Sequence, residues 1–108
     1  MIKAKFWKDD KLHMTVKGHS RSAEKGQDLI CAAASMLVYT LAQDVMDHSD
    51  EYTEPPVVDV KSGKAEITVS PKEEVFAELL HTYFVIQKGL MVLAANNPSF
   101  VKVSPFTC

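Results

Sequence analysis

The residues best suited to chemistry lie in one short segment, residues 18–35, which reads GHSRSAEKGQDLICAAAS. His19 follows the first glycine of this segment, and Cys31 lies twelve residues further along the chain. A cysteine thiolate attacks carbonyl carbons, and a neighbouring imidazole takes the thiol proton and later donates it to a leaving amine. The two side chains would therefore support acyl transfer, provided that the fold brings them together.

The pattern after this loop predicts that Cys31 lies at the start of a helix. From Leu29 onward, apolar residues recur on one helical face, at Ile30, Ala34, Leu37, Leu41 and Val45. Asp28 precedes this stripe and fits an N-cap, which would place Cys31 at position N3. The unpaired N–H groups and the positive dipole end of a helix stabilise a thiolate and a developing oxyanion.

The residues alone leave other interpretations of the pair open. Cysteine is among the most frequently buried residue types, so Cys31 could instead be a small core residue, and His19 a solvated loop residue. A redox or metal-binding role for Cys31 is a further alternative. It has less support, because the four histidines and two cysteines include no pair at helical or Cys-x-x-Cys spacing. We expect no metal and no cofactor.

The elements around this segment predict a two-layer α+β domain. Apolar and polar residues alternate over residues 2–17 and 58–69, which indicates two β-hairpins. Helical patterns cover residues 29–47 and the stretch from Pro71 to about Asn96, the second behind a capping box at Ser70–Glu73. A short strand follows at 100–103. The order ββ-loop-α-ββ-α-β predicts a mostly antiparallel five-stranded sheet with both long helices packed on it.

Length and composition indicate one soluble domain over residues 1–108, with 46% hydrophobic and 24% charged residues. The longest uncharged stretch, Leu29 to Gln43, is too short and too polar for a membrane span, and no secretory leader is visible. Two cysteines make no disulfide framework, so a cytoplasmic setting is expected. A net charge of -2 gives no charge excess for nucleic acid, and we expect neither direct nucleic-acid nor membrane binding.

Residues 18–35 resemble the motif of the ribosomal-processing cysteine proteases, small bacterial proteins of about this length. The matching pattern is G-H-S-x-x-A-E-x-G-x-D-x-x-C-A-A-x-S, which runs from Gly18 to Ser35. The resemblance extends in outline over the whole chain, from the N-terminal hairpin to the ending at 97–103. His19 and Cys31 have the separation found in the family, and Arg21-Ser22 departs from the small residues common in the family's loop.

The resemblance implies a cysteine endopeptidase that removes the N-terminal extension of a large-subunit ribosomal protein during ribosome assembly, after a Phe-containing site. It implies a homodimer with a mobile loop over the active site. Cys31 would be the nucleophile and His19 the proton acceptor and donor, with Gly18 allowing the loop to turn. Asp28 would orient His19 or only cap the helix, and Ser35 would support the site or merely pack. The alternative is a non-catalytic ribosome-associated binding module with a structural Cys31.

Overall fold

The computed structural model describes residues 1–19 and 25–107, and for residues 25–28 it describes the backbone alone. Two long helices and two short 3-10 turns alternate with five strands. In chain order these are β1 (Ile2–Lys8), β2 (Leu12–Lys17), α1 (Lys25–Asp47), η1 (Ser49–Glu51), β3 (Val57–Lys61), β4 (Lys64–Val69), η2 (Glu73–Val75), α2 (Phe76–Asn96) and β5 (Val101–Val103).

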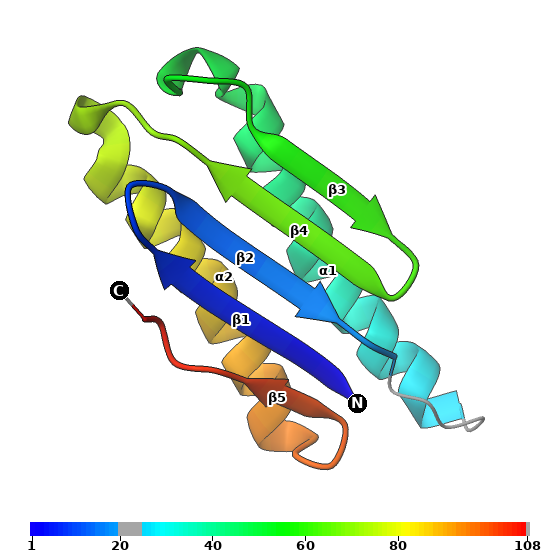
Figure 1. The fold of residues 1–108 in the computed structure, drawn as a ribbon. Coiled ribbons are helices and arrows are strands. Elements are labelled where there is room, and N and C mark those ends of the chain that lie inside the picture. The colour runs from blue at the N-terminus through cyan, green and yellow to red at the C-terminus, as the bar shows by residue number, and fades with distance from the viewer. Residues whose placement is uncertain (20–24, 108) are drawn as a thin grey trace.

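The five strands form one mixed sheet in the order β3-β4-β2-β1-β5. Its neighbouring strands pair antiparallel except for β1 and β5, which run parallel. Both long helices lie on the same face of this sheet, behind it in Figure 1. The predicted architecture, a mostly antiparallel five-stranded sheet under two helices, is therefore confirmed.

The core lies between the sheet and the two helices. Alternate residues of β1, β2 and β4 are buried, as the period of two predicts. From α1 the buried stripe comprises Ile30, Ala34, Val38, Leu41, Ala42 and Val45. The outward-facing residues of the strands are mostly polar, so the sheet buries one face and presents the other to solvent.

Among residues 1–19 and 25–107, one helix is long and apolar enough to cross a membrane, judged by length and composition alone. It is the 19-residue stretch Leu29–Asp47 of α1, which is longer than the uncharged stretch Leu29 to Gln43. In the fold, the apolar stripe of this helix packs into the domain core, which is the behaviour of a core helix.

Two helix starts differ from the sequence prediction. Helix α1 begins at Lys25, so Asp28 lies inside the helix and the prediction of an N-cap at Asp28 is wrong. Gly26 costs only about 1 kcal/mol relative to alanine inside a helix, which does not keep this turn from forming. The capping box at Ser70 is also wrong: the Ser70 hydroxyl donates to Glu54 at 2.9 Å, and Pro71 pairs with Tyr52 in extended chain.

Tyr83 joins α2 to the sheet through a buried hydrogen bond. Its side chain is fully buried, burial raises its pKa, and its hydroxyl donates to the Ile67 carbonyl oxygen at 3.1 Å. Tyr83→Phe should lower the free energy of unfolding by about 1 kcal/mol, measured by urea denaturation. Tyr39→Phe is the control, since that ring is exposed and its substitution should change little. Equal stability of the wild type and Tyr83→Phe would contradict the assignment.

Candidate active site

Gly18 directly follows β2 and turns the chain towards the site. Its φ of +100° lies in the region that favours glycine, and its N–H donates to the Gly63 carbonyl oxygen at 2.8 Å. A Cβ at this position would overlap the carbonyl oxygen of Met1. Conformation and close packing both require a residue without a side chain here.

His19 is held from two sides. The ammonium group of Met1 donates to the His19 carbonyl oxygen at 2.7 Å. The imidazole lies directly over Gly63, in the turn between β3 and β4, because a Cβ added to Gly63 would overlap Nε2 of His19. Gly63 itself has φ +77°. The backbone and the ring of His19 are thus positioned by different parts of the sheet.

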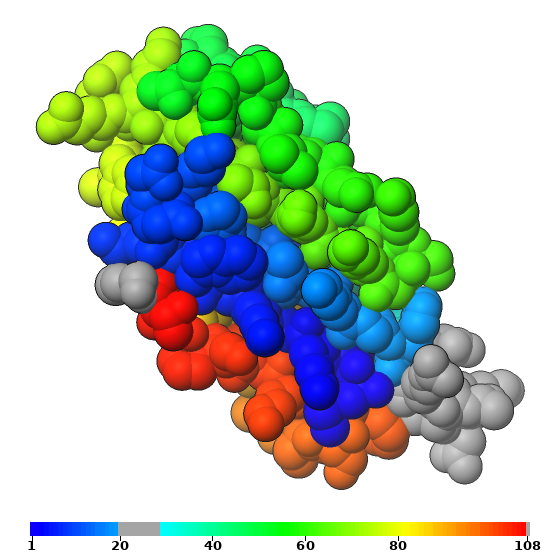
Figure 2. Space-filling model, in the orientation of Figure 1, coloured from blue at the N-terminus to red at the C-terminus, as the bar shows by residue number. Residues whose placement is uncertain are grey.

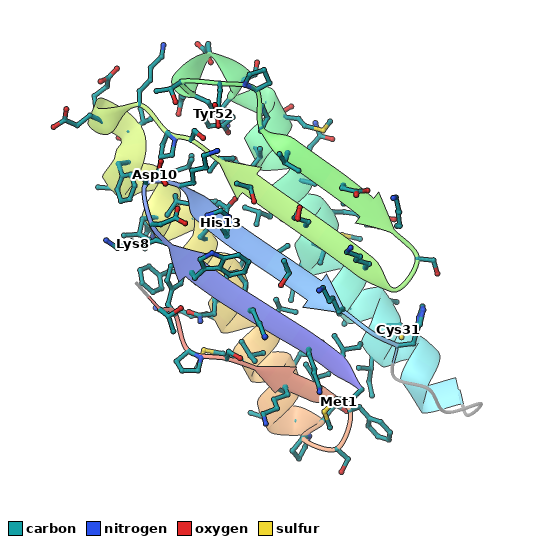
Figure 3. All side chains as sticks on the ribbon, in the orientation of Figure 1. Met1, Lys8, Asp10, His13, Cys31 and Tyr52 are labelled. Atoms are coloured by element: carbon teal, nitrogen blue, oxygen red, sulfur yellow. The ribbon has the colours of Figure 1, made fainter. Side chains whose placement is uncertain are left out.

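Cys31 comes to the same place from the other layer. It is half-buried on α1 and packs against the core. Figure 3 shows it on α1 beside the end of the sheet at which Met1 lies. A pocket of about 390 Å³ opens there, and its lining includes four of the predicted site residues: Gly18, His19, Cys31 and Ser35. The fold therefore places the thiol and the imidazole on the walls of one cavity.

The remaining walls of the pocket differ in character. The floor is apolar, with side chains from the sheet and α1, namely Ile2, Val16, Ala34, Val38 and Val60. The turn residues 61–64, and Tyr39 from α1, complete the lining. An apolar floor beside two polar reactive groups suits an apolar side chain next to a reacting carbonyl.

The position of Cys31 in its helix corrects one expectation. Counted from Lys25, Cys31 is the seventh residue of α1 and belongs to its second turn, not to N3. Only the first four N–H groups of a helix lack helical partners, and the dipole effect is confined to the first turn. The N-terminal end of α1 is therefore not positioned to stabilise a thiolate at Cys31, contrary to what the sequence predicted. The evidence that places Cys31 in the candidate site is the pocket that it shares with His19.

The other predicted site residues are placed as follows. Ser35 lies one helical turn after Cys31 and lines the pocket. The side chain of Asp28 and the loop residues Arg21 and Ser22 lie outside the described residues. Within residues 1–19 and 25–107, no group of three or more His, Cys, Asp or Glu side chains could hold a metal ion.

Sequence reasoning missed the contribution of the β3–β4 turn. The sequence predicts a hairpin over residues 58–69, yet nothing in its local pattern indicates that the turn at Ser62-Gly63 touches His19. The contact arises because β4 pairs with β2, which sets Lys64 opposite Lys17, immediately before Gly18. A prediction of that strand pairing would have been needed to find Gly63.

The sequence model that defines the cysteine protease Prp family matches residues 1–102 of the chain. This match confirms the resemblance identified in the sequence. No curated protein matches the chain.

Similar folds are found among solved structures. One is SMU.848 from Streptococcus mutans, at 28% identity and TM-score 0.76, covering 100% of this chain and 96% of that one. Another is the ribosomal processing protease Prp from S. aureus with a covalently linked product peptide, at 17% identity and TM-score 0.75, covering 98% and 99%. The same protease with a substrate peptide matches at 15% identity and TM-score 0.71, again covering 98% and 99%. At such low identity, the S. aureus structures establish a shared fold.

Proposed function

Because the chain belongs to the cysteine protease Prp family, we propose that it removes the N-terminal extension of a bacterial large-subunit ribosomal protein during ribosome assembly. The observation that carries the proposal is the single pocket lined by both His19 and Cys31. The S. aureus protein of the same fold is described as a ribosomal processing protease, which supports the choice of substrate.

In the proposed mechanism Cys31 and His19 act as a dyad. His19 takes the thiol proton, and the Cys31 sulfur adds to the scissile carbonyl carbon. His19 then donates that proton to the departing amine as the peptide bond breaks, leaving an acyl-enzyme. A water molecule, deprotonated by His19, attacks the acyl carbon, and the thiolate leaves as the carboxylate product forms. Ser35, one turn along α1, supports the site, and Gly18 sets the direction of the chain into His19.

The substrate would bind as an extended peptide with an aromatic side chain in the pocket. The apolar floor, which includes Val38 and Val60, is suited to a phenylalanine ring near the cleaved bond. The pocket lies at one end of the sheet, beside the turn between β3 and β4, so a chain can approach from solvent. Cleavage after a Phe-containing site is the specificity that this arrangement favours.

The proposed enzyme is a cytoplasmic homodimer. Two rows of exposed apolar side chains follow the outer helix faces. On α1 they are Leu29, Met36, Tyr39 and Met46, and on α2 they are Phe84, Val85, Met91 and Val92. On α1 the successive intervals are seven, three and seven residues. On α2 each of the two pairs, Phe84 with Met91 and Val85 with Val92, is seven residues apart. Each set therefore forms a stripe along its helix. Stripes of this kind suit contact with a second copy, which sedimentation would detect.

The direct test is incubation of the enzyme with the ribosomal protein precursor, followed by intact-mass analysis. We expect loss of a mass equal to the N-terminal extension, with the new N-terminus following a phenylalanine-containing sequence. A precursor mass that stays unchanged, with a folded enzyme, would favour the non-catalytic binding module instead.

The reactivity of Cys31 gives an independent prediction. In a Cys108→Ser background, iodoacetamide should modify Cys31 in the folded protein at neutral pH, because the side chain lines an open pocket. His19→Ala should slow this reaction several-fold, since the imidazole then no longer takes the thiol proton. Mass spectrometry of timed samples measures both rates. Modification that requires unfolding would mean that Cys31 is a core residue.

A further inference from the structure

A row of lysines crosses the open face of the sheet. The strand register aligns one lysine on each of the five strands, in the spatial order Lys61, Lys64, Lys17, Lys3 and Lys102. All five are exposed and alternate with residues that face the helices. Neighbouring strands lie about 4.8 Å apart, so the row extends roughly 19 Å across the whole sheet. Figure 2 shows this face of the molecule as one continuous surface.

Such a row is costly in the isolated protein. Like charges directly opposite each other on paired strands destabilise a sheet. The adjoining row on the same face contains two acidic residues, Asp59 and Glu66. Among the described residues, Lys61 forms the row's only ion pair, with Asp59 at 3.6 Å. Four of the five lysines thus have no acidic partner within that part of the chain.

Protection against aggregation explains only the ends of the row. Lysine on an edge strand discourages pairing with another sheet, which accounts for Lys61 on β3 and Lys102 on β5. The other three lysines, Lys3, Lys17 and Lys64, lie on interior strands, whose backbone groups are already paired. A binding function for the row explains all five positions.

We propose that this lysine row binds the phosphate backbone of single-stranded RNA. A line of ammonium groups on flexible stems matches a line of phosphates, which bind through charge and counterion release. Trp7 lies on the same open face, four residues along β1 from Lys3, and its ring stacks on His13 with centroids 4.6 Å apart. Aromatic rings beside a basic surface are the usual platform for unstacked bases.

The surface fits RNA better than a membrane. A membrane surface would need apolar side chains beside the charges, whereas the neighbouring positions carry Thr15, Glu66 and Asp59. A folded acidic protein is the other partner that lysines suit, and the test below includes poly-glutamate as its probe. The choice of RNA over DNA rests on the proposed function at the ribosome. The expectation of no nucleic-acid contact rested on the total charge of -2 and took no account of where the charges lie.

The row also adjoins the candidate active site. Lys17 immediately precedes Gly18, and Lys61 and Lys64 belong to the turn that lines the pocket. RNA bound along the row would hold the pocket at the surface of a ribonucleoprotein, next to the chain end to be cut. The surface would thereby act as a second recognition element beside the peptide pocket, with Lys61 and Lys64 common to both.

The test uses the full chain with Cys31→Ala, so that binding is measured apart from cleavage. A fluorescein-labelled 12-nucleotide oligouridylate is titrated at several salt concentrations and followed by anisotropy. We expect log K to fall with log salt at a slope of about -3.5, because each of the five lysines makes one phosphate contact and each contact contributes about 0.7. Quenching of Trp7, the single tryptophan, should accompany binding.

A matched pair of variants locates the binding surface. Lys3→Gln with Lys102→Gln removes two row charges outside the pocket lining, and Lys72→Gln with Lys88→Gln removes two exposed charges elsewhere. Both pairs change the formal charge from -2 to -4, since each removes two positive charges. The row pair should weaken binding about tenfold at low salt and reduce the slope by about 1.4, whereas the control pair should change the slope little.

Several outcomes would overturn the proposal. These are no binding, equal losses in the two variant pairs, DNA of the same length binding as tightly as RNA, or binding to poly-glutamate or to anionic phosphatidylserine vesicles in preference to RNA. Because precursor cleavage is assayed with the free ribosomal protein, failure of RNA binding leaves the proposed protease function standing. Conversely, if the chain binds RNA through the row but does not cleave the precursor, the RNA-binding proposal stands and the proposed protease function fails.

Discussion

Cys31→Ala is expected to lower the rate of precursor cleavage by about 10⁴-fold or more, because it removes the sulfur that forms the acyl-enzyme in the proposed mechanism. The substitution leaves the fold intact, since the side chain is only half-buried and alanine is a good helix former. The rate is measured by intact-mass analysis at matched enzyme concentration, and folding by circular dichroism.

Two controls make this result specific. Cys108→Ala removes the other cysteine and should cleave at the wild-type rate. The cleavage rate of His19→Ala should fall nearly as far as that of Cys31→Ala. The double variant should be no slower than either single variant, because the two residues act as a unit in the proposed mechanism. Wild-type cleavage by folded Cys31→Ala would refute the assignment of the nucleophile.

Gly63→Ala is expected to lower kcat by about 100-fold, although Gly63 carries no reactive group. The added Cβ would occupy the space of the His19 ring, so the imidazole has to move. A displacement of about 1 Å in a catalytic group costs about that factor. The φ of +77° adds a strain of about 1 to 2 kcal/mol to the folded state of the variant.

Gly63→Asn separates the two effects. Asparagine tolerates positive φ better than alanine, but it still carries the Cβ that meets His19. We therefore expect Gly63→Asn to recover part of the lost stability while its kcat stays low. If kcat instead recovers in Gly63→Asn together with the free energy of unfolding, Gly63 serves only the turn and does not position His19.

The sequence was sufficient for the elements and the core. Alternation in β1 and β2 and the stripe through Leu41 and Val45 depend on local periodicity, which the fold preserves. The helix starts were less predictable. Asp28 has the chemistry of an N-cap, but α1 begins three residues earlier, and Ser70 uses its hydroxyl on Glu54 instead of on a helix. Capping residues have other available partners, and tertiary contacts decide among them.

The candidate site was predictable only in part, because some of its contacts depend on tertiary structure. His19 and Cys31 belong to one continuous motif, so their residue types and spacing could indicate chemistry together. Gly63 and the lysine row depend on which strand lies beside which, and local patterns carry no information on strand order. The pairing of β2 with β4 makes both features at once, since it sets Lys17 opposite Lys64 and Gly18 near Gly63.

The contact between Gly18 and Gly63 has a consequence for the life of the newly made protein. These residues are forty-five positions apart in the sequence. They meet only after β4 has been synthesised and has paired with β2. Contacts of such long range form late in folding. A nascent or partly folded chain therefore carries the proposed nucleophile, Cys31, before His19 is positioned, and on the proposed mechanism activity begins only with the completed tertiary structure.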